Sequence, residues 1–229
     1  MSRIHTESFP CNHCGKPLEM GIVASINADR RPDLREGVLD GTFQRGKCAA
    51  CGNAFRAEPE LTYLDVARRQ WILVQPARQL GQWNELEAMA RSGFANAYGE
   101  EAPEGARRIG AGMSARIAFG WAAFREKLLA AEHKLDDVTL ELLKFAVLRG
   151  LEDAPVGDDI ELRLSKVAAT ELELVWCSAS GELAIESMTV PRGLYDEIAA
   201  DPEGEWAPLR AEVSAGPFVD MNRLLVEIA

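Results

Sequence analysis

The sequence predicts an α+β fold in which a β-rich amino-terminal unit with packed helices precedes a small antiparallel-sheet α+β unit. Three observations predict it: two early cysteine pairs built alike, short apolar runs with strand-like alternation, and longer runs with helical recurrence. With 229 residues, 47% of them hydrophobic, the chain can bury a sizeable core in one or two domains. Breakers and charges at 154–159 predict a boundary there, between domains over residues 1–150 and 155–229.

The cysteine pairs form two Cys-x-x-Cys-Gly knuckles, at residues 11–15 and 48–52. Two cysteines separated by two residues can bring both sulfurs to one side of a tight turn, and two such turns supply four thiolates for a closed tetrahedral zinc site. The glycine after each pair permits the positive φ that such a turn requires. The sequence therefore predicts one structural zinc ion, held by Cys11, Cys14, Cys48 and Cys51.

Two other roles for these cysteines are less favoured. A catalytic zinc ion needs an open coordination position, and four thiolates leave none. A thioredoxin-like redox role expects one active pair in a strand–helix context rather than two matching pairs. His13 could in principle replace a cysteine, but the duplicated pattern already completes the ligand set, so we expect His13 to face solvent.

The 33 residues between Cys14 and Cys48 exceed the roughly 15 to 20 of a compact zinc ribbon, so this segment needs structure of its own. We expect a strand over 20–28 and a turn into a short helix at 31–36. Strands at 42–45 and 54–57 would then form a hairpin with the second knuckle at its tip. The first unit is therefore predicted to be zinc-ribbon-like.

Several segments outside the knuckles resemble a known family. They are residues 24–29, 32–36, 40–41, 61–65, 71–74, 119–127 and 135–137. Together with the cysteine pairs, they resemble the bacterial CpXC family over roughly residues 7–150. The resemblance implies a metal site at the cysteines and no defined activity. The family's proline after the first cysteine of each pair is replaced here by Asn12 and Ala49, which leaves all four sulfurs in place.

The remainder of the first domain alternates short strands and helices. Runs at 61–65 and 70–75 predict a hairpin with Arg68 and Arg69 at its tip, where a solvated turn is favoured over a phosphate contact. Helical recurrence covers 83–98, and a loop is expected at 99–105.

Two further helices are predicted next. One has Ser114 as its N-cap and runs through Ala131, and the other begins at Asp136 or Asp137 and ends at Gly150. The two aspartates are interpreted as helix-capping residues rather than as an acid–base pair. The glycines at 110–112 lack the lysine and the preceding strand of a phosphate-binding loop.

The second domain is predicted to contain three antiparallel strands, at 160–164, 171–176 and 182–186, and two helices. Pro191 suits the first turn of a helix through Ala200, and the last helix would run from Phe218 through Ile228. Cys177 is expected to be a buried free thiol, because all three histidines lie in the other domain and no base is at hand for catalysis.

Charge and hydropathy limit the classes of function. The chain carries a net charge of −11, and residues 151–229 hold 17 acidic but only five basic side chains. Nucleic acid is disfavoured as a partner because duplex binding depends on Lys and Arg. No apolar run reaches the roughly 20 residues of a membrane span and no export signal is visible, so we expect a cytoplasmic protein with reduced cysteines and no membrane partner.

Three functions remain in view. The favoured one is a non-enzymatic zinc-binding adaptor or regulatory protein with a protein partner of unknown identity. The second is a nucleic-acid-binding zinc ribbon, which an exposed cluster of Arg30, Arg31, Arg35 and Arg45 would favour. The third is an enzyme with a site assembled from distant residues, which a deep pocket holding acids with perturbed pKa values would favour.

Overall fold

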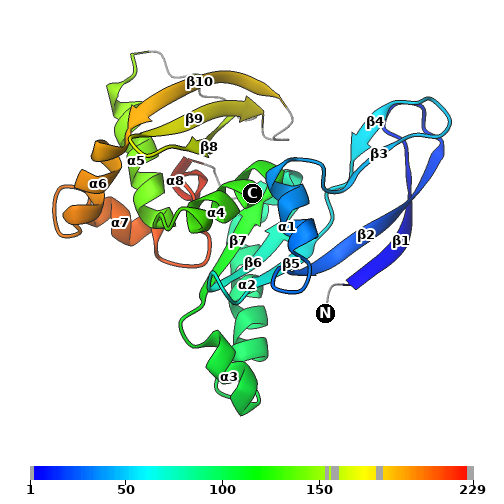
Figure 1. The fold of residues 1–229 in the computed structure, drawn as a ribbon, viewed down its shortest axis with the longest axis horizontal. Helices are drawn as coiled ribbons and strands as arrows, with labels where there is room; N and C mark the ends of the chain where they lie inside the picture. The colour runs from blue at the N-terminus through cyan, green and yellow to red at the C-terminus, as the bar shows by residue number, and fades with distance from the viewer. Residues whose placement is uncertain (1–2, 153–154, 156–159, 179–182, 226–229) are drawn as a thin grey trace.

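The computed structural model describes residues 3–152, 155, 160–178 and 183–225 and shows mixed helices and strands (Figure 1). The strands form sheets of five, three and two strands. The predicted α+β class is confirmed. Most of the predicted boundary segment 154–159 lies outside the described residues, as do Glu182 and Ile228, where an expected strand begins and an expected helix ends.

The five-stranded sheet has the order β1-β2-β5-β6-β7. Its strands are β1 (Arg3–Pro10), β2 (Pro17–Asn27), β5 (Leu61–Asp65), β6 (Gln70–Gln75) and β7 (Ser114–Phe119). The β1–β2 and β5–β6 pairs are antiparallel, whereas β2–β5 and β6–β7 are parallel. The β5–β6 hairpin is confirmed, and β1 is a strand that the sequence did not predict.

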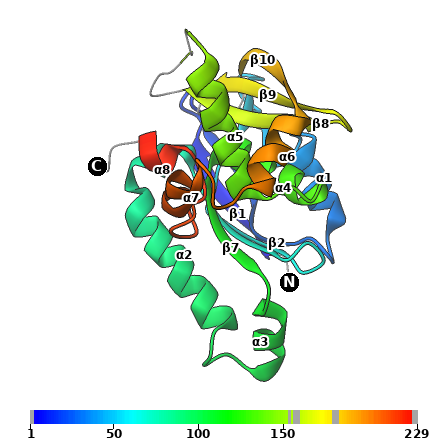
Figure 2. The ribbon, with the colours of Figure 1, turned by 90° about the vertical axis from the view of Figure 1, so that its left-hand side faces the viewer.

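Helices cover both faces of this sheet, and β6 shows why. Ile72 and Val74 are buried on the face that packs against α1 (Pro32–Leu39) and α4 (Gly120–Glu132). Trp71 and Leu73 point the other way, into a core shared with α2 (Trp83–Tyr98). The short η1 (Ala77–Gln82) leads into α2. Helix α3 (Glu104–Gly110) follows α2 in the chain (Figure 2). The helix over 83–98 is confirmed.

Three predictions in this part need correction. The helix expected from Ser114 begins only at Gly120, because residues 114–119 pair with β6 as strand β7. The loop expected at 99–105 gives way to α3 at Glu104. Of the strand expected at 42–45, only Arg45 is extended, in β3 (Arg45–Lys47), which pairs with β4 (Ala54–Arg56).

The three-stranded sheet is antiparallel, as predicted, with the order β10-β9-β8. Its strands are β8 (Ile160–Val167), β9 (Glu171–Ser178) and β10 (Ala184–Pro191). The helices of this part are α5 (Asp137–Gly150), α6 (Arg192–Ala200), α7 (Ala207–Val213) and α8 (Asn222–Leu225). Helix α5 buries Leu140, Leu142 and Leu143 in the same core as β8 and β9. The division into domains at 1–150 and 155–229 stays a prediction.

The last helix starts later than predicted. Phe218 and Val219 are buried in irregular backbone, and the backbone N–H of Phe218 donates to the Glu87 carboxylate of α2 at 2.8 Å. The Phe218 N–H and the Val219 carbonyl, which accepts from the Lys127 ammonium, bond to other elements, and the helix begins only at Asn222. No helix within the described ranges combines the length and the apolar character needed to cross a membrane.

Candidate metal centre

The two cysteine knuckles lie at the tips of two hairpins. The first joins β1 to β2, where Pro10 pairs with Pro17, and the second joins β3 to β4. In each knuckle the glycine N–H donates to the carbonyl of the first cysteine at 2.8 Å, from Gly15 and from Gly52. Their φ angles of +71° and +73° lie in the left-handed region that glycine adopts without strain. The local sequence thus builds the same turn twice.

The tertiary fold then brings the two turns together. The Sγ atoms of Cys11, Cys14, Cys48 and Cys51 all lie within 4.8 Å of one another. The Sγ atoms of Cys11 and Cys51 are 3.8 Å apart, and those of Cys14 and Cys48 are 3.7 Å apart. Four sulfurs bound at about 2.3 Å to a tetrahedral zinc ion would lie about 3.8 Å from one another. The Cys11–Cys51 and Cys14–Cys48 distances match this spacing, and the four sulfurs are close enough together to hold a metal ion.

A small apolar core packs beside the four cysteines. Cys11 and Cys48 are buried together with Leu18. Phe9 and Phe55, one from each hairpin, meet edge to face with ring centroids 5.6 Å apart. This contact holds the two hairpins against each other beside the four sulfurs.

The acidity of the cysteines depends on what surrounds the sulfurs. The backbone N–H of Asn53 holds the pKa of Cys51 below its ordinary value, since a hydrogen bond to the thiolate stabilises the charged form. The backbone N–H of Lys16 lowers the pKa of Cys14 in the same way, but desolvation and the three neighbouring thiols raise it to about 12. Four adjacent thiols cannot all ionise alone, and a bound cation removes that obstacle by deprotonating its ligands.

The other sulfur and imidazole groups stand apart. His13 is exposed, as expected, and does not belong to the group of four. Cys177 is buried in β9, where its thiol donates to the Glu161 carbonyl at 3.6 Å and burial raises its pKa to about 11. A thiol of this kind behaves as a small apolar residue.

The fold and the cluster define an α+β protein with a ribbon-type four-cysteine centre. A family model described as "CpXC protein" matches residues 9–144, more than half of the chain. The chain therefore belongs to the CpXC family, as the resemblance predicted. Comparisons with curated proteins and with solved structures found no match.

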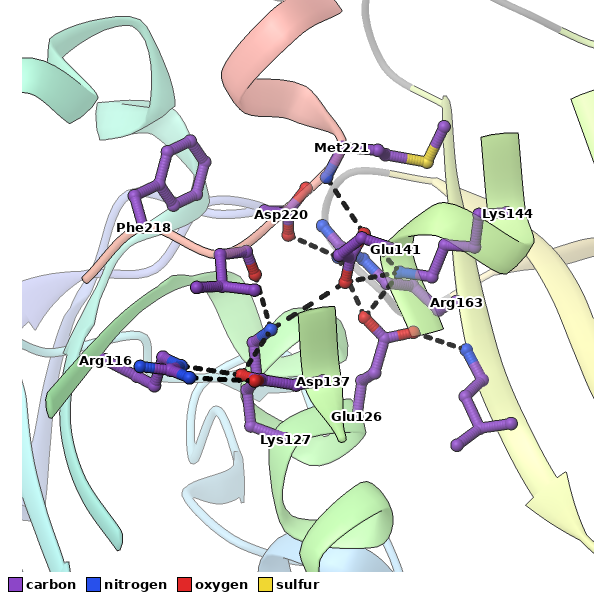
Figure 3. Close-up of polar contacts among 12 residues, drawn as sticks. Arg116, Glu126, Lys127, Asp137, Glu141, Lys144, Arg163, Phe218, Asp220 and Met221 are labelled. Atoms are coloured by element: carbon purple, nitrogen blue, oxygen red, sulfur yellow. Dashed lines mark hydrogen bonds and ion pairs between the residues drawn. The ribbon is translucent and has the colours of Figure 1, made fainter. Parts of the chain in front are cut away.

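The structure also gathers charged residues that the sequence did not single out. They lie on β7, α4, α5, β8 and the segment before α8, and we call them the internal charge cluster (Figure 3). Its members are Arg116, Glu126, Lys127, Asp137, Glu141, Lys144, Glu161, Arg163 and Asp220. Sequence alone shows only the helical spacing of Glu141 and Lys144, which is equally typical of a solvated face.

Three carboxylates of the internal charge cluster, from Glu126, Glu141 and Asp220, lie close enough together to suggest a metal site. Cations of the protein already occupy the space between them. The Lys144 ammonium lies 2.7 Å from Glu126 and 3.0 Å from Glu141, and Arg163 lies 2.5 Å from Asp220. We therefore interpret this group as a structural ion network.

Five carboxylates face four cations in the internal charge cluster, so one negative charge is in excess. Desolvation, together with the nearby Asp220 and Glu126, raises the pKa of Glu141 to about 7 although Lys144 opposes this. The pKa of Asp137 is held well below its usual range because Lys127 and Arg116 outweigh its desolvation. Desolvation raises the pKa of Glu161 as well, so ionisation is disfavoured at both Glu141 and Glu161.

The remaining predicted residues have structural roles. Asp136 caps α5 by accepting from the Thr139 N–H at 2.9 Å, which confirms the capping interpretation for this residue. Arg35, from the arginine set that would favour nucleic acid, is 7% exposed and pairs with Glu132 at 2.5 Å, while Arg31 pairs with Asp33. The exposed arginine cluster is therefore not formed.

Proposed function

We propose that the protein is a non-enzymatic, cytoplasmic adaptor or regulatory protein whose four cysteines hold one structural zinc ion. The observation that carries the proposal is the convergence of four sulfurs from the tips of two hairpins, all within 4.8 Å of one another and with two distances between the knuckles of 3.8 and 3.7 Å. Soft thiolates in tetrahedral spacing select zinc over hard cations such as Mg²⁺ or Ca²⁺. Four thiolates leave no position for a substrate, which supports a structural role.

The hairpins also supply a surface for a partner. In Figure 1 the β1–β2 and β3–β4 hairpins extend away from the helices. Strand β1 is at the edge of its sheet and exposed along nearly its whole length, with the Ile4 side chain 56% exposed. An edge strand offers unpaired backbone groups to another chain, and an exposed apolar side chain adds affinity. This arm is the proposed contact for a protein partner.

The metal part of the proposal is tested by elemental analysis of untagged protein and by thermal unfolding before and after chelation. We expect one zinc per chain and a lower melting temperature without it, because site and fold are coupled. Cys48→Ser should lose the metal, whereas Cys177→Ala, which removes a thiol outside the cluster, should keep it. Equal metal content in the two variants would contradict the assignment.

The partner part is tested separately with Ile4→Asp, which changes the exposed arm and leaves all four cysteines in place. Proteins recovered with the wild type from a lysate of the source cells should be lost with Ile4→Asp and retained with Met89→Asp, at an exposed apolar side chain of α2. Binding of duplex DNA or RNA with a steep dependence on salt, and no protein partner, would favour the nucleic-acid alternative instead.

The enzyme alternative has less support. Glu141 and Glu161, two internal acids with raised pKa values, are buried and do not line the pocket of about 880 Å³ beside the five-stranded sheet. The acids that do line this pocket include Glu132 and Asp137. Desolvation would raise their pKa values, but the neighbouring cations outweigh it and lower them, Arg35 and Arg68 at Glu132 and Lys127 and Arg116 at Asp137. Ionised, ion-paired carboxylates of this kind are poor proton donors at neutral pH.

A further inference from the structure

A pocket of about 880 Å³ opens beside the five-stranded sheet. One wall is the β5–β6 turn, a second is the start of β7, and a third is the junction between α4 and α5. Its volume lies in the range of about 300 to 1,000 Å³ that small-molecule sites occupy. It shares no residue with the four-cysteine centre.

The pocket is positively charged although the chain as a whole is acidic. Five cationic residues line it against three acidic ones: Arg68, Arg69, Arg116, Lys127 and Lys134, against Glu132, Asp136 and Asp137. The Lys127 side chain is buried, and its ammonium bonds to Asp137 and to the Val219 carbonyl. The lining therefore has a surplus of two positive charges.

Ion pairs show which cations are already used. Arg68 pairs with Glu132 at 2.9 Å, Arg116 with Asp137 at 2.7 Å, and Lys127 with Asp137 at 3.1 Å. Neither Arg69 nor Lys134 has a side-chain hydrogen bond or ion pair within the described part of the chain, and both are exposed. Among the five lining cations, Arg69 and Lys134 are thus the two without an ion pair in the described part of the chain, and they lie 65 positions apart in the sequence.

The backbone makes these two residues unusual. Within the described residues, only three that are not glycine have a positive φ: Gln44, Arg69 and Lys134. Arg69 ends the β5–β6 turn, and Lys134 follows α4 in a C-terminal cap where the Leu135 N–H donates to the Ala130 carbonyl at 2.9 Å. Glycine or asparagine is the favoured residue at both kinds of position. The chain instead has two unpaired cations there, at a conformational cost that the fold alone does not explain.

We propose that this pocket binds a small molecule that carries a phosphate monoester. Such a group has a charge of about −1.5 to −2 at pH 7, which matches the two unpaired cations. The Arg69 guanidinium supplies a planar pair of donors and the Lys134 ammonium a point charge. The paired cations Arg116 and Lys127 lie deeper, and the rest of the pocket accommodates the body of the ligand.

The test uses the full-length, metal-loaded protein with glycine at the two left-handed positions. Arg69→Gly/Lys134→Gly relieves the backbone, so its melting temperature should equal or exceed that of the wild type. The matched control, Arg91→Ala/Lys166→Ala, removes one exposed arginine and one exposed lysine outside the pocket. The probes are inorganic phosphate, AMP and adenosine, measured by calorimetric titration.

We expect the wild type and the control to bind AMP saturably at one site and to bind adenosine much more weakly. The glycine variant should lose at least about tenfold in affinity per cation, because a charged hydrogen bond contributes about 1.5 kcal/mol and about 1.4 kcal/mol is tenfold in affinity. Equal affinities in the two double variants would overturn the proposal, as would no saturable binding of phosphate or AMP by the wild type. Binding of duplex DNA alone would replace it with a nucleic-acid surface. None of these results depends on the metal content of the cysteine cluster.

Discussion

The internal charge cluster gives a sharp prediction about stability, at Lys144. Its side chain is fully buried, and its ammonium lies 2.7 Å from Glu126 and 3.0 Å from Glu141. Lys144→Met keeps most of the side-chain volume, so a cavity contributes little, but it leaves two buried carboxylates without their shared cation. Removing one partner of a buried ion pair costs about 3 to 5 kcal/mol. In a chain of this length that loss lowers the melting temperature by roughly 10 °C.

The loss should depend on pH with a definite sign. Without Lys144 the carboxylates of Glu126 and Glu141 become harder to ionise, so their folded-state pKa values rise. A carboxyl group with a raised folded-state pKa contributes stability at low pH and loses it as the pH rises through that value. The difference between variant and wild type should therefore be largest near pH 8 and smaller near pH 5.5.

Urea unfolding at both pH values measures this difference directly. Lys166→Met serves as the control, because Lys166 is an exposed lysine on β8 and its replacement should change stability by no more than about 0.5 kcal/mol. A loss below about 1 kcal/mol at pH 8, or a loss that grows as the pH falls, would refute the assignment of Lys144 as the central cation of the cluster.

Two further predictions concern Glu141 and the knuckles. Burial raises the pKa of Glu141 from 4.5 to about 7, so its favourable contribution to stability is present below about pH 4.5 and is lost as the pH rises through 7. Between pH 5 and pH 8, Glu141→Gln should therefore gain up to about 3 kcal/mol of stability relative to the wild type. Urea unfolding measures this gain, with Glu186→Gln, at an exposed glutamate, as the control. A constant difference across that range would contradict it. Gly52→Ala and Gly41→Ala, at φ +73° and +77° with no atom within 4 Å of an added Cβ, should each cost about 1 kcal/mol. Only Gly52→Ala should also speed zinc loss to a chelator, and equal rates in the two variants would show that the knuckle turn does not control metal binding.

Local patterns predicted the elements whose structure depends on neighbours in sequence. The knuckles could be read directly, because two-residue spacing and a following glycine define the turn whatever surrounds it. The strands of the β5–β6 hairpin and the cap at Asp136 follow from alternation and from a side chain that satisfies a nearby backbone N–H. These features hold because their hydrogen bonds close within a few residues.

Strand β7 shows where local reading fails. Ile117, Trp121 and Phe124 recur with helical spacing, but residues 114–119 find parallel partners in β6, 44 positions earlier in the chain. Pairing with a distant strand satisfies the same backbone hydrogen bonds that a helix would, and burial of side chains on both faces of the sheet adds to the stability of the strand. The helical recurrence therefore continued across a boundary that only the sheet determines.

The sequence by itself determined the α+β class, the four cysteines and the glycines that shape their turns, because those depend on covalent spacing and local φ angles. Only the tertiary structure decided that the two knuckles meet, that Lys144 is buried among carboxylates, and that Arg69 and Lys134 line one pocket. Each of these brings together residues far apart in the chain. A local sequence pattern predicts that charged side chains of this kind face solvent. Long-range packing alone sets their actual surroundings, and hence the strength of their electrostatic interactions.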